Sequence, residues 1–133
     1  MVLNLDFAQT FLEAAGIDAP NDMQGESLIP LLTENGEDWT RDAVYYHYYE
    51  YPSVHMVKRH YGIVNKDYKL VRFYYDVDEW ELYDRKNDPN EMNNVYNDPE
   101  YSVIVSDLKI ELAEMRKKYK DSEELDQKFI YKK

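Results

Sequence analysis

The 133-residue chain contains no cysteine, only four glycines and fewer bases than acids. Without cysteine there is no disulfide, no thiolate nucleophile and no zinc–thiolate site within these residues. Four glycines leave little room for a glycine-rich phosphate loop, and the G-x-S-x-G and H-E-x-x-H motifs are missing too. We therefore predict no catalytic and no metal-ligating residue in this chain.

Charge and hydropathy exclude two further classes of partner. The chain has 27 acids against 16 bases, a net charge of −11. This balance opposes nucleic-acid binding, which depends on Lys and Arg to neutralise phosphates. No apolar run approaches the roughly 20 residues of a membrane helix, so we expect no membrane partner. With 44% hydrophobic and 15% aromatic residues, the chain can still form a folded core.

Residues 1–37 are expected to form one helix and a linker. Apolar residues recur at helical spacing in residues 1–16, with Asp6 as a plausible N-cap and Gly16 suited to the left-handed position after the helix. The rest is mostly loop, with a turn signal at Asn35–Gly36. These residues have too few apolar groups to fold alone, so we expect them to pack against a segment outside this chain.

From residue 38 onward the composition is typical of strands. Four segments are rich in tyrosine and β-branched residues, namely 43–51, 55–64, 68–77 and 80–84. Residues 65–67 form a turn signal that predicts an antiparallel hairpin. Alternation along the first segment places Tyr45 and His47 on one face, and Tyr46 and Tyr48 on the other. We predict a small antiparallel sheet of about four strands.

Two Asn-Asp-Pro triplets indicate helix starts after the sheet. They predict a short helix from Asp88 and a long helix from Asp98. The long helix carries an apolar stripe that should lie across one face of the sheet, formed by Tyr101, Ile104, Leu108, Leu112, Met115 and Tyr119. The last residues, 121–133, are expected to be a fraying tail or an edge segment. The predicted fold class is α+β.

The segment Tyr45–Arg72 contains all three histidines and a local excess of cations. Between Ser53 and Arg72 there are five basic residues and one acid. Cations attract negative charge and tyrosine faces stack on rings, so the segment suggests an anionic, ring-containing ligand. Structural alternatives stay open: hydrogen-bonded histidines, a packed tyrosine interior and lysines that protect a sheet edge. His55 and His60 would face opposite ways on one regular strand, which gives a metal site little support.

Five blocks of the sequence resemble the C-terminal part of the type I sulfatase family. They are NLDFAQTFLEAAG (4–16), DMQGESLIPLL (22–32), WTRDAVYYHYY (39–49), YKLVR (68–72) and ELYDRKNDPNE (81–91). They follow one another in the family's order. The run HYYEYP…HMVKRHYG is most similar to bacterial N-acetylglucosamine-6-sulfatase and iduronate-2-sulfatase-like members.

The resemblance implies a large alkaline-phosphatase-like α/β domain followed by a smaller C-terminal subdomain of sheet and helix. Residues 1–37 would be the last helix and linker of the large domain, and residues 38–133 the C-terminal subdomain. Family members hydrolyse sulfate esters with a formylglycine, made in a C/S-x-P-x-R motif, and a calcium ion. Neither that motif nor the calcium ligands occurs here. We therefore expect a fragment without a cofactor, inactive alone, with calcium and formylglycine in the missing domain.

In the intact enzyme the resemblance implies that this part forms one wall of the substrate pocket. The matching positions for contacts to a sulfated, glycosaminoglycan-type carbohydrate are His47, His55, Lys58 and His60. The parent is expected to be periplasmic or secreted, and the exposed junction offers a surface for dimerisation of the fragment. Two alternatives stay open: a non-catalytic carbohydrate or protein interaction module, and a phosphatase or phosphodiesterase of the same superfamily.

Overall fold

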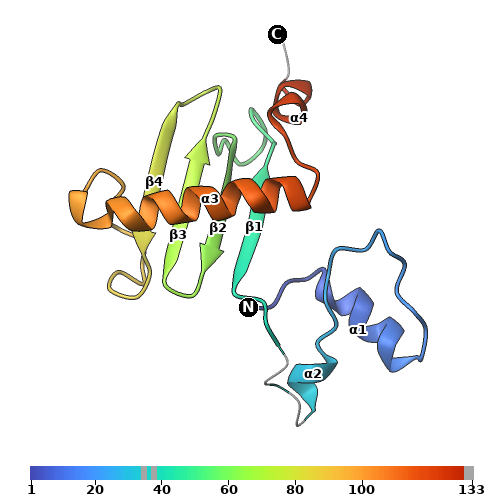
Figure 1. Cartoon of the computed structure of the whole chain (residues 1–133). Coiled ribbons are helices and arrows are strands. Elements are labelled where there is room, and N and C mark those ends of the chain that lie inside the picture. Colours follow the sequence, from blue (N-terminus) through green and yellow to red (C-terminus); the bar gives the residue numbers. More distant parts are fainter. Residues whose placement is uncertain (34–35, 37–38, 131–133) are drawn as a thin grey trace. The chain divides into compact units, whose positions relative to one another are not determined.

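The computed structural model describes residues 1–33, 36 and 39–130 (Figure 1). The chain divides into two compact units, Met1–Asp42 and Ala43–Lys133. The turn predicted at Asn35 and the domain boundary predicted between residues 37 and 38 lie outside the described residues, so both stay predictions. Within the described part of the chain, no helix is long and apolar enough to cross a membrane.

The first unit contains two helices, α1 (Asp6–Ala14) and α2 (Ile29–Leu32). The helix predicted within residues 1–16 is confirmed, and Gly16 has the expected positive φ of 70° after its end. The predicted N-cap is wrong, because Leu5 holds that position and Asp6 is the first residue inside the helix.

Asp6 instead organises the polar interior of this unit. Its fully buried carboxylate accepts hydrogen bonds from the Leu3 and Glu26 amides at 2.6 and 3.0 Å, and from Arg41 at 2.6 and 2.8 Å. Burial alone would raise the pKa of Asp6, but these donors outweigh it and lower the pKa to about 2. The α1 helix therefore turns polar residues inward, whereas Phe7 and Phe11 are exposed.

The second unit is built on an antiparallel sheet with the strand order β1-β2-β3-β4 (Figure 1). The strands are β1 (Ala43–Tyr48), β2 (His60–Asn65), β3 (Tyr68–Phe73) and β4 (Glu79–Asp84). The predicted hairpin is confirmed, since the Asn65 side chain accepts hydrogen bonds from the Asp67 and Tyr68 amides. The α+β class with four antiparallel strands is as predicted.

The strand predicted at residues 55–64 begins five residues later than expected. Residues 49–59 form an irregular segment between β1 and β2, with a cis bond before Pro52 and a positive φ of 51° at Met56. His55 therefore lies on this segment and not on a strand. The alternation argument applied to His55 and His60 is wrong for this reason.

The long helix α3 (Ser102–Lys118) crosses one face of the sheet, as Figure 1 shows. A short 3-10 turn, η2 (Pro99–Tyr101), precedes it, and the Asp98 side chain caps this turn by accepting from the Glu100 amide at 3.0 Å. The predicted stripe is confirmed, because Leu108 and Leu112 are buried against the sheet. Their core partners are Ala43, Ile63, Leu70 and Leu82.

Two predictions about the helices are wrong. Asp88 starts no helix, because its carboxylate accepts hydrogen bonds from the Met92 and Asn93 amides and closes a loop instead. Residues 121–130 are not a fraying tail, since they include α4 (Glu123–Lys128), capped by the Ser122 hydroxyl. Polar contacts of buried side chains order α4, and a sequence pattern does not reveal them.

Candidate functional site

The predicted ligand residues lie on different faces of the sheet. In the β1–β2 register, Tyr48 pairs with His60 and His47 pairs with Tyr61. Alternation sends His47 to the face that α3 covers, where it meets Asp121. His60 lies on the opposite face with Tyr48, its ring stacked at a centroid distance of 5.6 Å. The structure therefore does not gather all predicted contacts into one site.

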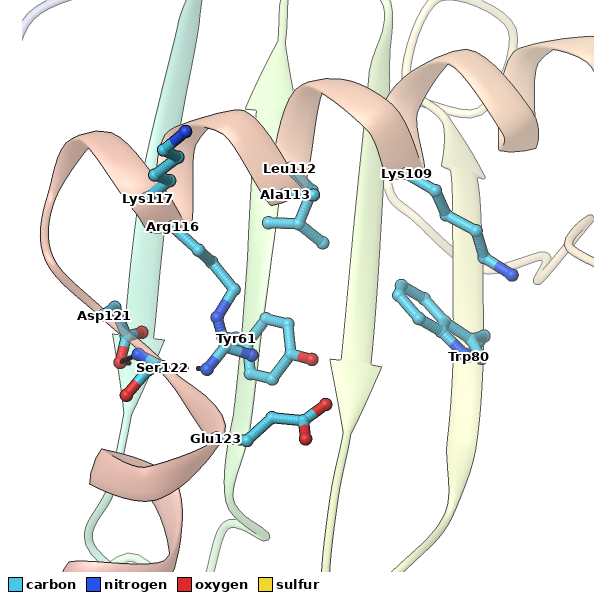
Figure 2. Close-up of a pocket in the computed structure, with 10 residues that line it drawn as sticks. All are labelled: Tyr61, Trp80, Lys109, Leu112, Ala113, Arg116, Lys117, Asp121, Ser122 and Glu123. Carbon is cyan, nitrogen blue, oxygen red and sulfur yellow. Dashed lines mark hydrogen bonds and ion pairs between the residues drawn. The ribbon is translucent and has the colours of Figure 1, made fainter.

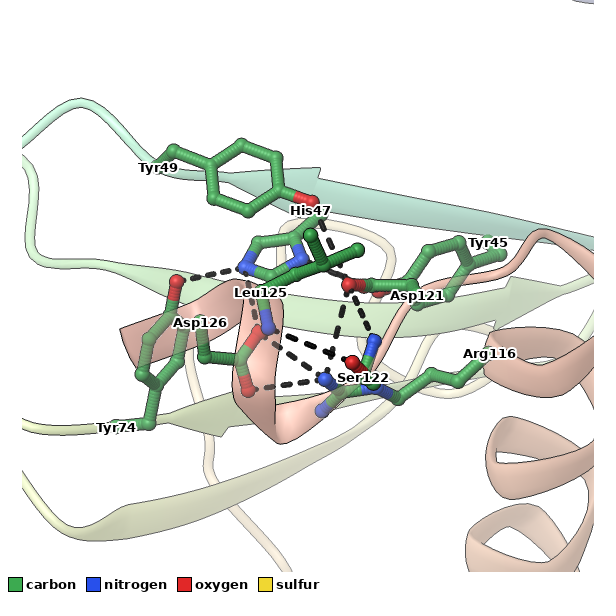
Figure 3. A network of polar contacts seen from close by, with 9 residues as sticks. All are labelled: Tyr45, His47, Tyr49, Tyr74, Arg116, Asp121, Ser122, Leu125 and Asp126. Carbon is green, nitrogen blue, oxygen red and sulfur yellow. Dashed lines mark hydrogen bonds and ion pairs between the residues drawn. The ribbon is translucent and has the colours of Figure 1, made fainter. Parts of the chain in front are cut away.

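His47 belongs to a buried network of polar side chains (Figure 3). Its Nδ1 lies 2.7 Å from Asp121 Oδ2, and its Nε2 lies 2.7 Å from the Tyr74 hydroxyl. Its ring also stacks on Tyr49 at a centroid distance of 3.7 Å. Both ring nitrogens are thus engaged inside the protein, which favours the structural alternative for this histidine. Its predicted substrate contact stays untested.

The second half of the network joins α3 to α4. Arg116 Nη2 donates to both carboxylate oxygens of Asp126, at 3.0 and 2.9 Å, and lies 3.8 Å from Asp121. Its guanidinium carbon lies 3.8 Å from the Tyr61 ring centroid. These contacts fix the end of α3, the turn that follows and α4 to the tyrosine-rich face of the sheet.

The network already holds a cation beside its carboxylates. Burial lowers the pKa of His47 although Asp121 opposes this, so the imidazole is neutral near pH 7. Burial alone would raise the pKa of Asp121, but hydrogen bonds from Tyr45 and His47 lower it. His47, Asp121 and Asp126 bring ligand atoms within 4.8 Å of one another. Arg116 supplies one positive charge against these two carboxylates, and burial raises the pKa of Asp126, so the guanidinium offsets part of the negative charge.

Three of the predicted ligand residues lie on the 49–59 segment or at the start of β2. His55 is exposed on the 49–59 segment, and Lys58 donates a hydrogen bond to the Tyr51 hydroxyl. His60 Nδ1 lies 2.8 Å from the Lys58 carbonyl and donates to it. This segment with His60 is the candidate ligand-facing site, because it presents polar donors without a covering helix.

The cationic cluster that the sequence suggested is largely neutralised. Arg59 pairs with Asp76 at 2.6 Å. Lys69 and Arg72 form ion pairs with acids that follow them in the chain, Glu91 and Asp78 respectively. Sequence counting missed these acids because they lie outside the segment and reach it only in the folded chain. The segment from Ser53 to Arg72 therefore attracts anions less strongly than its own composition implied.

A groove of about 400 Å³ opens on the other face of the sheet, beside α3 (Figure 2). It is lined by Tyr61, Trp80, Lys109, Leu112, Ala113, Arg116, Lys117, Asp121, Ser122 and Glu123. Lys109 occupies the Trp80 face, with its ammonium 4.5 Å from the ring centroid. Sequence reasoning missed this groove because its residues come from β2, β4, α3 and residues 121–123, which meet only in the folded chain.

Comparison with known proteins gives one family and several relatives. The model of the family described as N-sulphoglucosamine sulphohydrolase, C-terminal, matches residues 1–118. An N-acetylglucosamine-6-O-sulfatase of Bacteroides thetaiotaomicron is 53% identical over 124 residues, which are 91% of this chain and 22% of that protein. The chain thus spans under a quarter of the length of this relative.

Solved structures resemble the same region. A protein in complex with its substrate D-glucosamine-2-N,6-O-disulfate is 54% identical over 89% of this chain and 24% of its own, with a TM-score of 0.83. A 2-O GAG sulfatase is 29% identical over 87% of this chain and 25% of its own, with a TM-score of 0.74. In both cases the matching part is a minor portion of a longer chain.

Proposed function

The chain belongs to the N-sulphoglucosamine sulphohydrolase C-terminal family, and from this premise we propose that it is the C-terminal part of an enzyme hydrolysing carbohydrate sulfate esters. One observation carries the proposal: 53% identity to an N-acetylglucosamine-6-O-sulfatase over 91% of the chain. The substrate class it favours is a 6-O-sulfated glucosamine. A relative solved with a disulfated glucosamine, 54% identical, supports the same class.

The contribution of this part is substrate recognition at one wall of the pocket. The 49–59 segment and His60 supply an imidazole, an ammonium and a second imidazole within a short stretch of chain. Such donors hydrogen-bond sugar hydroxyls or sulfate oxygens. The exposed Val54 and Met56 add apolar surface, which helps to exclude water from a bound sugar ring.

The chemical step is proposed to come from residues outside this chain. A formylglycine supplies the nucleophile and calcium the positive charge when both are present, as the family resemblance implies. The described residues fit neither group. Their one cluster of three possible metal ligands is already paired with the Arg116 guanidinium, and the chain has no C/S-x-P-x-R motif. We therefore assign binding and orientation, and no bond-breaking role, to this part.

The test is sulfate release by the full-length protein that contains this chain. The substrates are glucosamine 6-sulfate, a 2-O-sulfated uronic acid disaccharide and p-nitrophenyl phosphate. We expect release from the 6-O-sulfated glucosamine and none by the 133-residue chain alone. Phosphate release without sulfate release would support the phosphatase alternative. Binding of sulfated oligosaccharide by the chain alone, with no hydrolysis by the full protein, would support the interaction module.

A further inference from the structure

We propose that Arg59 is a positioning residue that holds the 49–59 segment, and with it His55 and Lys58, in its ligand-facing conformation. The proposal rests on the proposed function, since it concerns the same site. Arg59 is 2% exposed and is among the largest fully buried side chains of the described chain. A charged side chain at this depth needs specific partners.

The partners of Arg59 come from two separate segments. Its Nη1 donates to Asp76 Oδ2 at 2.6 Å, in the connection between β3 and β4. Its Nη2 donates to the carbonyl oxygen of Tyr51, near the start of the 49–59 segment. Its own carbonyl accepts from the Tyr74 amide at 3.3 Å. The guanidinium therefore ties the beginning of the segment to a fixed connection of the sheet.

The segment needs such a tie because it has little backbone support. Its residues pair with no strand, and its first ten residues make only local backbone hydrogen bonds, from the Tyr51 amide to the Tyr49 carbonyl and from the Met56 amide to the Ser53 carbonyl. The Arg59 carbonyl, at the end of the segment, accepts from the Tyr74 amide. Segments without ladder hydrogen bonds open at low free energy unless side chains hold them. Arg59 closes the segment from its far end, eight residues beyond the carbonyl that it contacts.

The contacts of Arg59 also affect the positions of the residues on either side of it, Lys58 and His60. Lys58 packs on the Tyr51 ring, with its ammonium 3.9 Å from the ring centroid. Arg59 binds the carbonyl oxygen of the same tyrosine, so it holds the residue on which Lys58 packs. His60 donates to the Lys58 carbonyl on the other side. A shift of Arg59 would therefore displace both adjoining side chains that are predicted to contact the substrate.

A contribution to folding stability alone does not explain why an arginine occupies position 59. Within the described part of the chain, Arg59 Nε is buried without a hydrogen-bond partner. An unsatisfied buried donor costs about 1–3 kcal/mol, more beside a charge. A well-packed apolar side chain often stabilises such a site equally or better. An apolar side chain could not make the two hydrogen bonds of Arg59, to the Asp76 carboxylate and to the Tyr51 carbonyl.

The experiment compares Arg59→Lys and Arg59→Met with the unaltered full-length protein. The matched control is Arg72→Lys, because Arg72 pairs with Asp78 of the same connection. For Arg59→Met we expect a KM for glucosamine 6-sulfate about tenfold higher with a smaller change in kcat, because a misplaced contact segment weakens binding. Hydrogen exchange of residues 49–59 should accelerate. Arg59→Lys should lie between, and the control should stay within about twofold.

Two outcomes would overturn the proposal. One is an active Arg59→Met enzyme with unaltered KM and unaltered exchange at residues 49–59. The other is a uniform rise in exchange over the whole second unit, with kcat and KM both changed and no recovery in Arg59→Lys, which indicates a purely structural role. If Arg59→Met fails to fold, Asp76→Asn is the milder substitute. An unaltered enzyme inactive on sulfated sugars refutes the proposed function, whereas the exchange comparison still decides the role of Arg59.

Discussion

Arg116 on α3 and Asp126 on α4 form a buried ion pair, with one guanidinium nitrogen 3.0 and 2.9 Å from the two carboxylate oxygens. The pair lies beside His47, whose Nε2 is 3.8 Å from Asp126. The pair therefore links the order of the C-terminal segment to the centre of the tyrosine-rich sheet.

Removing one partner of this pair should be costly. Asp126→Asn leaves the Arg116 charge buried without its closest carboxylate, and we expect a loss of about 3 kcal/mol in the free energy of unfolding. Urea unfolding followed by circular dichroism measures it. Glu124→Gln, on the exposed side of the same helix, is the matched control and should change stability by less than about 0.5 kcal/mol. Equal losses in both variants would contradict the structural role of the pair.

The buried His47 should make stability depend on mildly acidic pH. Burial lowers the pKa of His47 in the folded state below its ordinary value of 6.5. The unfolded chain therefore binds the proton more readily, and stability falls as the pH drops below about 6.5. Denaturation midpoints between pH 7.5 and about 5.5 test this, and because burial also raises the pKa of the neighbouring Asp126, the slope is compared with that of a variant without the imidazole. His47→Gln should flatten the slope, and an unchanged slope would count against the assignment.

Gly62 should tolerate no side chain. A Cβ at this position would lie 2.8 Å from the Tyr46 hydroxyl and would also meet the Leu70 carbonyl on the neighbouring strand. Gly62→Ala should therefore destabilise the protein by about 1–3 kcal/mol, because the backbone contact cannot relax by a rotamer change. Gly36→Ala is the control, since its nearest atom would be at an ordinary 3.7 Å. Thermal unfolding of both variants gives the comparison.

His55 should affect binding without affecting stability. Its side chain is exposed on the 49–59 segment, so His55→Gln removes no core contact. In the full-length protein we expect the KM for glucosamine 6-sulfate to rise by about tenfold, the value of one lost charge-assisted or strong hydrogen bond. The melting temperature should stay within about 1 °C. A lowered melting temperature with unaltered KM would reassign His55 to a structural role.

The family resemblance and the local patterns predicted much of the second unit correctly. Tyrosine and valine alternation indicated β1, and the Asn65 turn indicated the β2–β3 hairpin. Leu108 and Leu112 recur at helical spacing, so the face of α3 that packs on the sheet was readable too. Each of these signals depends on residues within a few positions of one another.

Several of the wrong predictions concern contacts between residues that are far apart in the sequence. Asp6 was expected to cap a helix, but Arg41, 35 residues away, draws its carboxylate into a buried cluster. The C-terminal residues were expected to be a fraying tail or an edge segment, but they include α4, which Arg116 holds through Asp126. The positive charge counted between Ser53 and Arg72 is offset by acids that follow that segment in the chain.

The amino-acid sequence by itself determined β1, the β2–β3 hairpin, the packing face of α3 and the family resemblance, because periodicity and linear motifs are local properties. The tertiary structure decided which side chains meet. It placed His47 in a buried network and His60 on the opposite face. Alternation along a strand shows only that two residues face opposite ways, and which face is buried is decided when α3 covers one side of the sheet. It also brought Arg59 to Asp76 and Tyr51, since ion pairs between distant segments depend on the fold and leave no periodic trace.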